Sequence, residues 1–226
     1  DLLVIGFGKG GKTIAAAMGR RGQRVVMVEQ SDQMYGGTCI NIGCVPTKAL
    51  VHDAESRRPG DAPKHWYARA VTRKTDLTAL LRGKNFDMLD MIDSVTVVTG
   101  RATFAGPREV EVRAGTDLLR IRAETVVIDT GSEPVIPEIP GVHDNPRVTT
   151  STTLIATEDL PARLVVIGGG YVGIELAGMY AQFGSQVTVI ESAERVFGRE
   201  DDDVAAAARE ILERQGVTFL TGVRAT

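Results

Sequence analysis

The chain opens with residues 2–11, LLVIGFGKGG, in which a short apolar run leads directly into a glycine-rich segment. An Ala-rich stretch follows that we predict to be a helix from about Lys12 to Arg21. Residues 24–29, RVVMVE, form a second apolar run that ends in Glu29. A continuous apolar run is typical of a strand buried on both faces of a parallel sheet. The first 29 residues therefore predict a strand–helix–strand unit.

The glycines of this unit have the spacing of a dinucleotide-binding turn. Gly6, Gly8 and Gly11 fit the pattern Gly-x-Gly-x-x-Gly between the predicted strand and helix. In such a turn the first glycine allows the tight bend, and the second lets a pyrophosphate approach the backbone. The third lets the helix pack closely on the strand. Glu29 then stands where an acid accepts the ribose hydroxyls, so we predict a dinucleotide site here.

The same residues also satisfy a second phosphate-binding pattern. The run from Gly6 through Gly11, Lys12 and Thr13 fits a P-loop, and residues 126–129, VVID, could serve as its magnesium-binding strand. Under this alternative the protein is a P-loop nucleotide-binding module. The position of Glu29 favours the dinucleotide interpretation, as does a cysteine motif that has no role in phosphoryl transfer.

The strand–helix–strand pattern occurs a second time. Residues 164–167, LVVI, precede Gly168, Gly170 and Gly173, and a predicted helix over 173–183 leads to a second strand ending in Glu191. Each acid lies 23 positions after the first glycine of its unit, at 6 and 29 and again at 168 and 191. Two matched units predict an α/β fold with two Rossmann-like dinucleotide-binding domains.

Residues 36–48, GGTCINIGCVPTK, contain the only two cysteines, Cys39 and Cys44. This spacing matches no zinc pattern, so we predict no metal site. In an unbroken helix their Cα atoms would lie about 8–9 Å apart, beyond the roughly 7 Å that a disulfide spans. A bridge between them requires a break in the helix, which Gly43 allows. A bridge closing so small a loop suits reversible redox chemistry. Two buried free cysteines are the alternative.

This stretch resembles the redox-active motif of the flavoprotein disulfide reductases, Gly-Gly-Thr-Cys-x-Asn-x-Gly-Cys-x-Pro-Ser-Lys, with Thr47 in place of Ser. The resemblance implies that NAD(P)H passes electrons through FAD to a Cys39–Cys44 disulfide and on to an oxidant. It implies that Cys39 attacks the substrate, that Cys44 faces the flavin, and that Lys48 lies beside the flavin and pairs with Glu175. A helix N-terminus near the thiols would favour their thiolate forms.

The resemblance also assigns residues around the cofactors. Tyr171 matches an aromatic side chain that covers the flavin until nicotinamide enters, although a core tyrosine is an equal alternative. Glu191 would repel a 2′-phosphate, which favours NADH over NADPH, whereas Arg195 nearby weakens that preference. Asp129 departs from the Ala that the family more often has before Thr-Gly. The further FAD-binding residues implied are Gly37, Thr38, Lys48, Ala102, Thr130 and Gly131.

Several flanking segments resemble one bacterial branch of the family, which is linked to reactive-chlorine resistance. They include residues 6–13, GFGKGGKT, residues 81–86, LRGKNF, and residues 199–201, RED. That branch is implicated in reducing hypothiocyanous acid and Cu(II). Mercuric reductase and dihydrolipoamide dehydrogenase are the alternatives within the class.

The remaining segments predict how the domains are built. Residues 64–92 read as mostly helical, and strands over 95–128 include an antiparallel meander and a buried strand at 125–128. The Pro-rich residues 132–152 read as a connection. We expect an FAD-binding domain over 1–150 and an incomplete NAD(P)-binding domain over 151–226. Family chains are longer, so we expect a truncated chain with little activity alone and a homodimer for the full-length protein.

Composition limits the partners. A net charge of −3 and a pI of about 5.7 indicate no basic surface for nucleic acid. No apolar run approaches the ~20 residues of a membrane span. Two cysteines do not make a secreted disulfide scaffold, so we expect a cytoplasmic enzyme that acts on a small-molecule oxidant.

Overall fold

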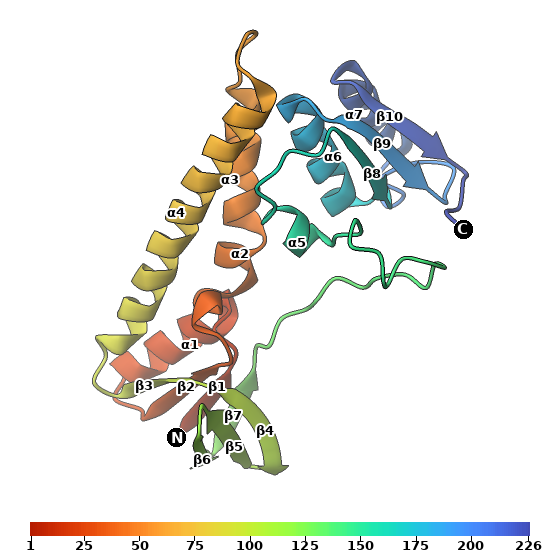
Figure 1. Cartoon of the computed structure of the whole chain (residues 1–226). Helices are drawn as coiled ribbons and strands as arrows, with labels where there is room; N and C mark the ends of the chain where they lie inside the picture. Colours follow the sequence, from red (N-terminus) through yellow and green to blue (C-terminus); the bar gives the residue numbers. More distant parts are fainter. The chain divides into compact units, whose positions relative to one another are not determined.

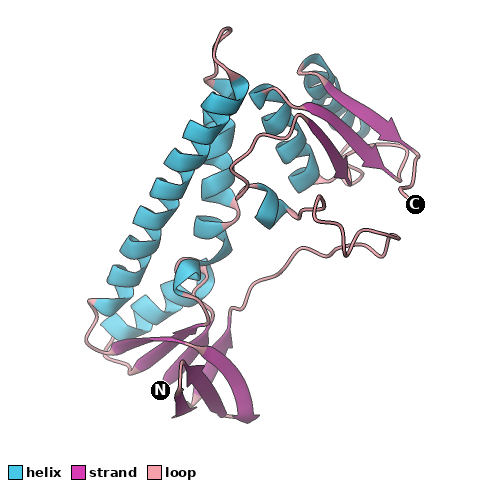
Figure 2. Cartoon of the chain, viewed as in Figure 1, coloured by secondary structure: helices cyan, strands magenta, loops and turns pink.

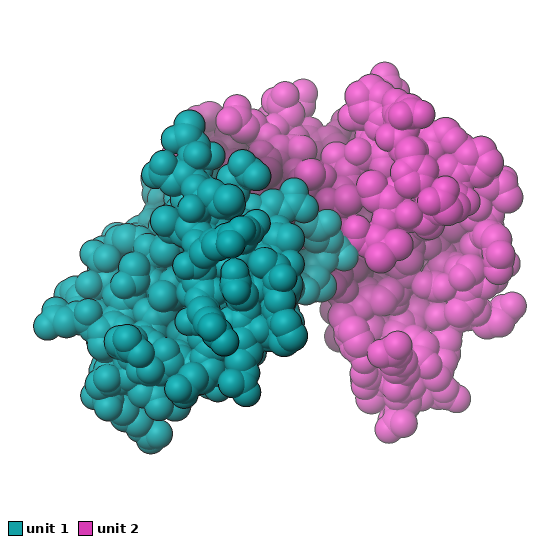
Figure 3. Space-filling model, turned by 90° about the horizontal axis from the view of Figure 1, so that it is seen from below, with its two compact units in different colours: residues 1–46, 75–133 teal, residues 47–74, 134–226 magenta.

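The computed structural model describes all 226 residues, which divide into two compact units (Figure 3). The first unit consists of residues 1–46 and 75–133, and the second of residues 47–74 and 134–226. The predicted division into residues 1–150 and 151–226 differs from these units. Residues 47–74 group with the later part of the chain.

The first unit is built on a parallel sheet with strand order β3-β2-β1-β7 (Figure 1). Its strands are β1 (Leu2–Ile5), β2 (Val25–Glu29), β3 (Val95–Thr99) and β7 (Thr125–Ile128). Leu2 lies opposite Val25 and Thr125, so β1 is paired on both sides. The apolar run that opens the sequence is therefore a central strand, as a parallel strand covered on both faces requires.

Two layers cover this sheet. Side chains alternate along β1, so that Leu2 and Val4 pack with Ala15 of helix α1 (Lys9–Arg20), whereas Leu3 packs in a core with Val110 and Val112. The two valines belong to an antiparallel sheet, which supplies the second layer. Its strands are β4 (Arg101–Gly106), β5 (Glu109–Ala114) and β6 (Asp117–Arg122).

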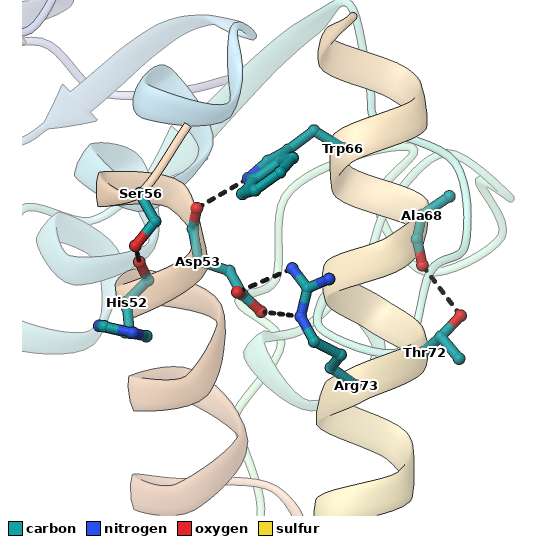
Figure 4. A network of polar contacts seen from close by, with 7 residues as sticks. All are labelled: His52, Asp53, Ser56, Trp66, Ala68, Thr72 and Arg73. Carbon is teal, nitrogen blue, oxygen red and sulfur yellow. Dashed lines mark hydrogen bonds and ion pairs between the residues drawn. The ribbon is translucent and has the colours of Figure 1, made fainter. Parts of the chain in front are cut away.

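The segment between β2 and β3 is helical (Figure 2). It contains the 3-10 helix η1 (Asp32–Met34) and the α-helices α2 (Gly37–Asn41), α3 (Cys44–Glu55) and α4 (Pro63–Asp90). Asp53 joins α3 to α4, as Figure 4 shows. The indole of Trp66 donates to its carbonyl oxygen at 2.8 Å, and Arg73 donates to both carboxylate oxygens at 2.8 and 3.2 Å.

The second unit is built on a parallel sheet with strand order β10-β9-β8. Its elements are α5 (Ser151–Leu154), β8 (Arg163–Ile167), α6 (Tyr171–Phe183), β9 (Gln186–Glu191), α7 (Asp202–Arg214) and β10 (Val217–Thr221). Its core joins α6 to α3 and to the first turns of α4. At its centre the hydroxyls of the fully buried Tyr67 and Tyr180 lie 2.9 Å apart.

The mixed α/β fold with parallel and antiparallel sheets confirms the predicted class. Three details differ. Helix α1 begins at Lys9 rather than Lys12, since Lys12 N–H already donates to Gly8 O at 3.0 Å. Helix α6 begins at Tyr171. Strand β7 was expected to be buried, yet Ile128 is 63% exposed because β7 forms the edge of its sheet. None of the helices combines the length and the apolar character needed to cross a bilayer.

Candidate functional site

The two glycine turns are built alike. Gly6 and Gly168 both have positive φ, at 101° and 109°, which a side chain would disfavour. A Cβ on Gly11 would lie 2.7 Å from Gly6 O and 2.9 Å from Val4 Cγ1, and one on Gly173 would lie 2.3 Å from Gly168 O. The third glycine of each turn thus allows its helix to reach the preceding strand, as the spacing predicts.

Glu29 holds the first turn in place. Its carboxylate accepts the backbone N–H of Phe7 at 2.9 Å and that of Ser31 at 3.2 Å. The same carboxylate lines a pocket of about 140 Å³ beside the turn. The predicted cofactor residues Gly6, Ala102 and Thr130 line this pocket too. The structure therefore gathers four predicted FAD-binding residues around one cavity of the first unit.

Glu191 repeats this arrangement in the second unit. Its carboxylate accepts the N–H of Ala193 at 2.8 Å and that of Gly169 at 2.6 Å. The hydrogen bond from Ala193, reinforced by that from Gly169, lowers the pKa of the Glu191 carboxyl against the opposing effect of burial. Arg195 forms an ion pair with Asp202.

A larger cleft of about 980 Å³ lies beside the second turn, within the second unit. Gly168, Gly170 and Gly173 line it together with Tyr171. Apolar side chains form much of the remaining wall, including Val165 of β8. A mostly apolar cleft that ends at a glycine turn has the chemistry to bind a nucleotide with a flat ring.

The predicted phosphate-side residues of the first unit also converge. A Cβ on Gly37 would lie 2.6 Å from Gly8 Cα, so the start of α2 packs directly on the glycine turn. A Cβ on Gly131 would lie 3.6 Å from Thr38 Oγ1. Residues far apart in the sequence thus form a narrow cradle at the N-terminus of α1, made of Gly8, Gly37, Thr38 and Gly131. Side chains larger than glycine would fill this cradle. A helix N-terminus lined by small residues is a type of site that binds phosphate groups.

The helix break that a bridge between the cysteines would require is present. Helix α2 ends at Asn41 and α3 begins at Cys44. The N–H groups of Ile42 and Gly43 both donate to Thr38 O, at 3.0 and 2.7 Å, which closes α2 tightly. Both thiols are free, and their side chains are hydrogen-bonded to each other. Cys39 is partly buried, whereas Cys44 is exposed, so the alternative of two buried cysteines is wrong.

The hydrogen bond between the thiols acts on Cys39. That bond to Cys44 raises the pKa of the Cys39 thiol, and burial raises it further, while the cations of Lys9 and Lys12 oppose both effects. The expectation of a thiolate favoured by the helix N-terminus is therefore wrong for Cys39. The contact with Cys44 and the burial of Cys39 together outweigh the effect of the nearby positive charges on its pKa.

Helix α4 supports the segment that carries Cys39, which sequence reasoning missed. Arg82 Nε donates to Asn41 Oδ1 at 3.0 Å, and Asn41 Nδ2 donates to Gly37 O at 2.9 Å and to Tyr35 O at 3.1 Å. This chain of hydrogen bonds ties α4 to both ends of α2.

Asn85 of α4 holds Lys12, whose ammonium group donates to the Asn85 side-chain oxygen. The lysine that a P-loop would direct to a phosphate is thus engaged by an amide. A signal for Asn85 exists in the sequence, since it lies four residues after Leu81 and four before the buried Leu89. A polar residue at that spacing within an apolar face indicates a specific partner.

Two features that the resemblance predicts near the flavin lie in the second unit. Lys48 of α3 forms an ion pair with Glu175 of α6, and the two side chains are 70% and 33% exposed. Tyr171 is 55% exposed, so the alternative of a core tyrosine is wrong. Its hydroxyl donates to the carboxylate of Glu200, and this hydrogen bond raises the pKa of Tyr171. Glu200 is a partner that sequence reasoning did not identify.

The chain resembles several known proteins. It is 43% identical over 218 residues to the probable pyridine nucleotide-disulfide oxidoreductase RclA of Escherichia coli K12, covering 96% of this chain and 48% of that protein. It is 36% identical over 234 residues to a mercuric reductase of Streptomyces lividans, covering 98% and 48%. It is also 36% identical over 243 residues to a dihydrolipoyl dehydrogenase of Thermus scotoductus, covering 100% and 49%. The chain thus spans about half the length of these relatives.

A solved structure matches closely. The Cu(II) complex of HOCl-induced flavoprotein disulfide reductase RclA from Escherichia coli superimposes with a TM-score of 0.93 at 42% identity, covering 99% of this chain and 49% of that one. The sequence pattern of one protein family matches residues 1–226. With the paired glycine turns and the adjacent thiols, these matches show that the chain belongs to the pyridine nucleotide-disulphide oxidoreductase family.

Proposed function

We propose that the protein is an FAD-dependent NAD(P)H oxidoreductase that passes electrons from nicotinamide through a flavin to a Cys39–Cys44 disulfide and on to a small oxidant. The observation that carries this proposal is the contact between the two thiols across the break between α2 and α3. In a regular helix the same residues would be too far apart to form a disulfide.

The first unit would hold FAD. Glu29 would accept the hydroxyls of the ribose, Ala102 and Thr130 would line the adenosine pocket, and the cradle of Gly8, Gly37, Thr38 and Gly131 would take the pyrophosphate. Bound FAD supplies a two-electron carrier between nicotinamide and the disulfide. Lys48, paired with Glu175, would lie beside the flavin ring.

The dithiol would reduce the oxidant in two steps. The Cys39 sulfur attacks the electrophilic atom of the oxidant, and the Cys44 sulfur then attacks Cys39 and displaces the reduced product. The disulfide that forms has lost two electrons, which pass to the oxidant, and two protons, which pass to the reduced product or to water. A one-electron oxidant such as Cu(II) would not be attacked in this way; two Cu(II) ions would each accept one electron as one disulfide forms. The thiolate is the attacking form, so the raised pKa of Cys39 opposes this step, whereas Lys9 and Lys12 would favour its anion.

The second unit would bind NADH in preference to NADPH. The lowered pKa of Glu191 keeps its carboxylate charged, and a charged carboxylate would repel a 2′-phosphate. Arg195 is already paired with Asp202, so its charge is not free to offset that repulsion. Tyr171, exposed in the cleft beside Gly170, would contact the incoming nicotinamide.

For the oxidant we propose hypothiocyanous acid or Cu(II), with reaction class EC 1.8.1.- or 1.16.1.-. The 42–43% identity to the Escherichia coli protein, which has been solved as a Cu(II) complex, favours this over the substrates of the mercuric reductase and the dihydrolipoyl dehydrogenase at 36%. We further propose a homodimer in the full-length protein, a cytoplasmic location suited to free thiols, a role under oxidative stress, and little activity for residues 1–226 alone.

The decisive experiment is an absorption spectrum of the natural full-length protein before and after anaerobic NADH. We expect flavin bands, and after reduction a long-wavelength band from a thiolate beside the flavin that Cys44→Ser abolishes. A protein without flavin bands would refute the proposal, and residues 6–13 would then be tested for ATP binding that depends on Lys12. NADH turnover by residues 1–226 at the full-length rate would refute the expected inactivity of this segment.

A further inference from the structure

The carboxylate of Asp129 occupies the N-terminus of α1. Asp129 follows β7, and its backbone N–H donates to Ile5 O at 2.7 Å, which fixes it beside β1. From there Asp129 Oδ2 accepts the backbone N–H of Gly11 at 2.7 Å. Helix α1 has no acidic residue in its first turn and no side-chain cap from Gly8. Asp129 therefore supplies, from another strand, the negative charge that a helix start favours.

The glycine turn is shaped around this carboxylate. A Cβ on Gly8 would lie 2.5 Å from Asp129 Oδ2, one on Gly11 would lie 2.8 Å from it, and one on Gly10 would lie 3.6 Å from Oδ1. The space that three glycines leave free at the start of α1 is thus filled by an anionic side chain of the same chain. Gly8 is also proposed to contact the pyrophosphate of FAD. That pyrophosphate would be a second anion at the N-terminus of α1, beside the Asp129 carboxylate.

We propose that Asp129 sets the affinity for the flavin nucleotide by competing with its pyrophosphate for the N-terminus of α1. The inference rests on the proposed binding of FAD to the first unit. The N–H groups at a helix start attract one negative charge, and two anions held there repel each other. Lys12 is bound to Asn85, so its ammonium group is already engaged. Binding of the nucleotide must therefore displace the Asp129 carboxylate or tolerate its charge.

The substitution Asp129→Asn removes the negative charge of the side chain but keeps its shape. The amide oxygen can still accept the Gly11 N–H, but the negative charge is gone. We expect FAD to bind about tenfold more tightly, because a like charge close to the phosphate is removed. The gain should shrink at high salt, since ions screen the repulsion. We also expect the melting temperature of the apoprotein to fall slightly, because a charged cap is the better one.

The test is a fluorescence titration of apoprotein from the natural full-length protein with FAD, at low and high salt. Asp117→Asn, at an exposed position of β6, controls for net charge. An FAD affinity of Asp129→Asn within twofold of that of Asp117→Asn would overturn the inference while leaving the proposed function intact. Failure of the wild-type apoprotein to bind FAD would instead refute the proposed function. Asp129→Ala, which loses both charge and cap, should lower the melting temperature further than Asp129→Asn.

Discussion

The side chains of Cys39 and Cys44 are hydrogen-bonded to each other across the break between α2 and α3. This contact raises the pKa of the Cys39 thiol, so the residue proposed to face the flavin disfavours deprotonation of the residue proposed to attack the oxidant. The balance between that contact and the cations of Lys9 and Lys12 is open to direct measurement.

The substitution Cys44→Ala should lower the pKa of Cys39, because the first cause of its elevation is removed. In the reduced protein, the rate at which iodoacetamide alkylates Cys39 should then reach half its maximum at a lower pH than in the wild type. Cys44→Ser, whose hydroxyl can also accept a hydrogen bond, should shift the midpoint less. An unchanged midpoint in Cys44→Ala would show that the thiols do not interact.

The support of α2 by Asn41 should be visible as local stability. Asn41→Ala leaves the carbonyls of Gly37 and Tyr35 without their donor and frees Arg82. We expect a loss of about 1–3 kcal/mol in the free energy of opening α2, as for other unsatisfied partly buried groups. Hydrogen exchange of amides 37–44 should accelerate, whereas exchange in β8 and β9 should not change. Equal protection of α2 in both proteins would contradict the assignment.

The tyrosine pair in the core of the second unit predicts a loss of global stability. Tyr67→Phe keeps the ring but removes a hydroxyl that donates to Thr157 O at 3.0 Å and contacts Tyr180. We expect the free energy of unfolding to fall by about 1–3 kcal/mol, measured with urea. Tyr35→Phe, whose hydroxyl meets Thr99 at the surface, is the matched control. If Tyr35→Phe lowers the free energy of unfolding as much as Tyr67→Phe does, burial of the Tyr67 hydroxyl is not the reason for the loss.

Glu191 should contribute to stability in a way that depends on pH. Its pKa in the folded protein lies below the ordinary value of 4.5, chiefly because of the Ala193 N–H. A lowered carboxyl pKa stabilises the fold fully above the unfolded value and loses this contribution as pH falls through the folded value. The stability difference between wild type and Glu191→Gln should therefore be constant from pH 7 down to about pH 5 and diminish below it. A constant difference down to pH 2 would exclude this linkage.

The Lys48–Glu175 ion pair should contribute little to stability but should affect flavin reduction. Both side chains are partly exposed, so Lys48→Met should change the free energy of unfolding by no more than about 0.5 kcal/mol. The proposed position beside the flavin predicts slower reduction by NADH in stopped-flow absorbance. Lys64→Met, at an exposed position of α4, should be neutral in both measurements. Wild-type reduction kinetics in Lys48→Met would argue against the proposed role.

Local features of the fold were predictable from the sequence because their causes are local. The third glycines, Gly11 and Gly173, predicted close helix–strand contacts that the structure shows, and Gly43 predicted the break between the cysteines. The start of α1 was misplaced by three residues because glycines weaken a helix without forbidding it. The exposure of Ile128 followed from strand order, which no local pattern of β7 encodes.

By itself the sequence determined the two glycine turns, the acids at their strand ends and the position of the dithiol, since each depends on the spacing of residues close together in the chain. Only the tertiary structure decided which residues act on that chemistry. Asn85 reaches Lys12 across 73 positions, and Asp129 reaches Gly11 across 118. Such partners are chosen by the pairing of β1 with β7 and by the packing of α4, which bring side chains together irrespective of their distance along the sequence.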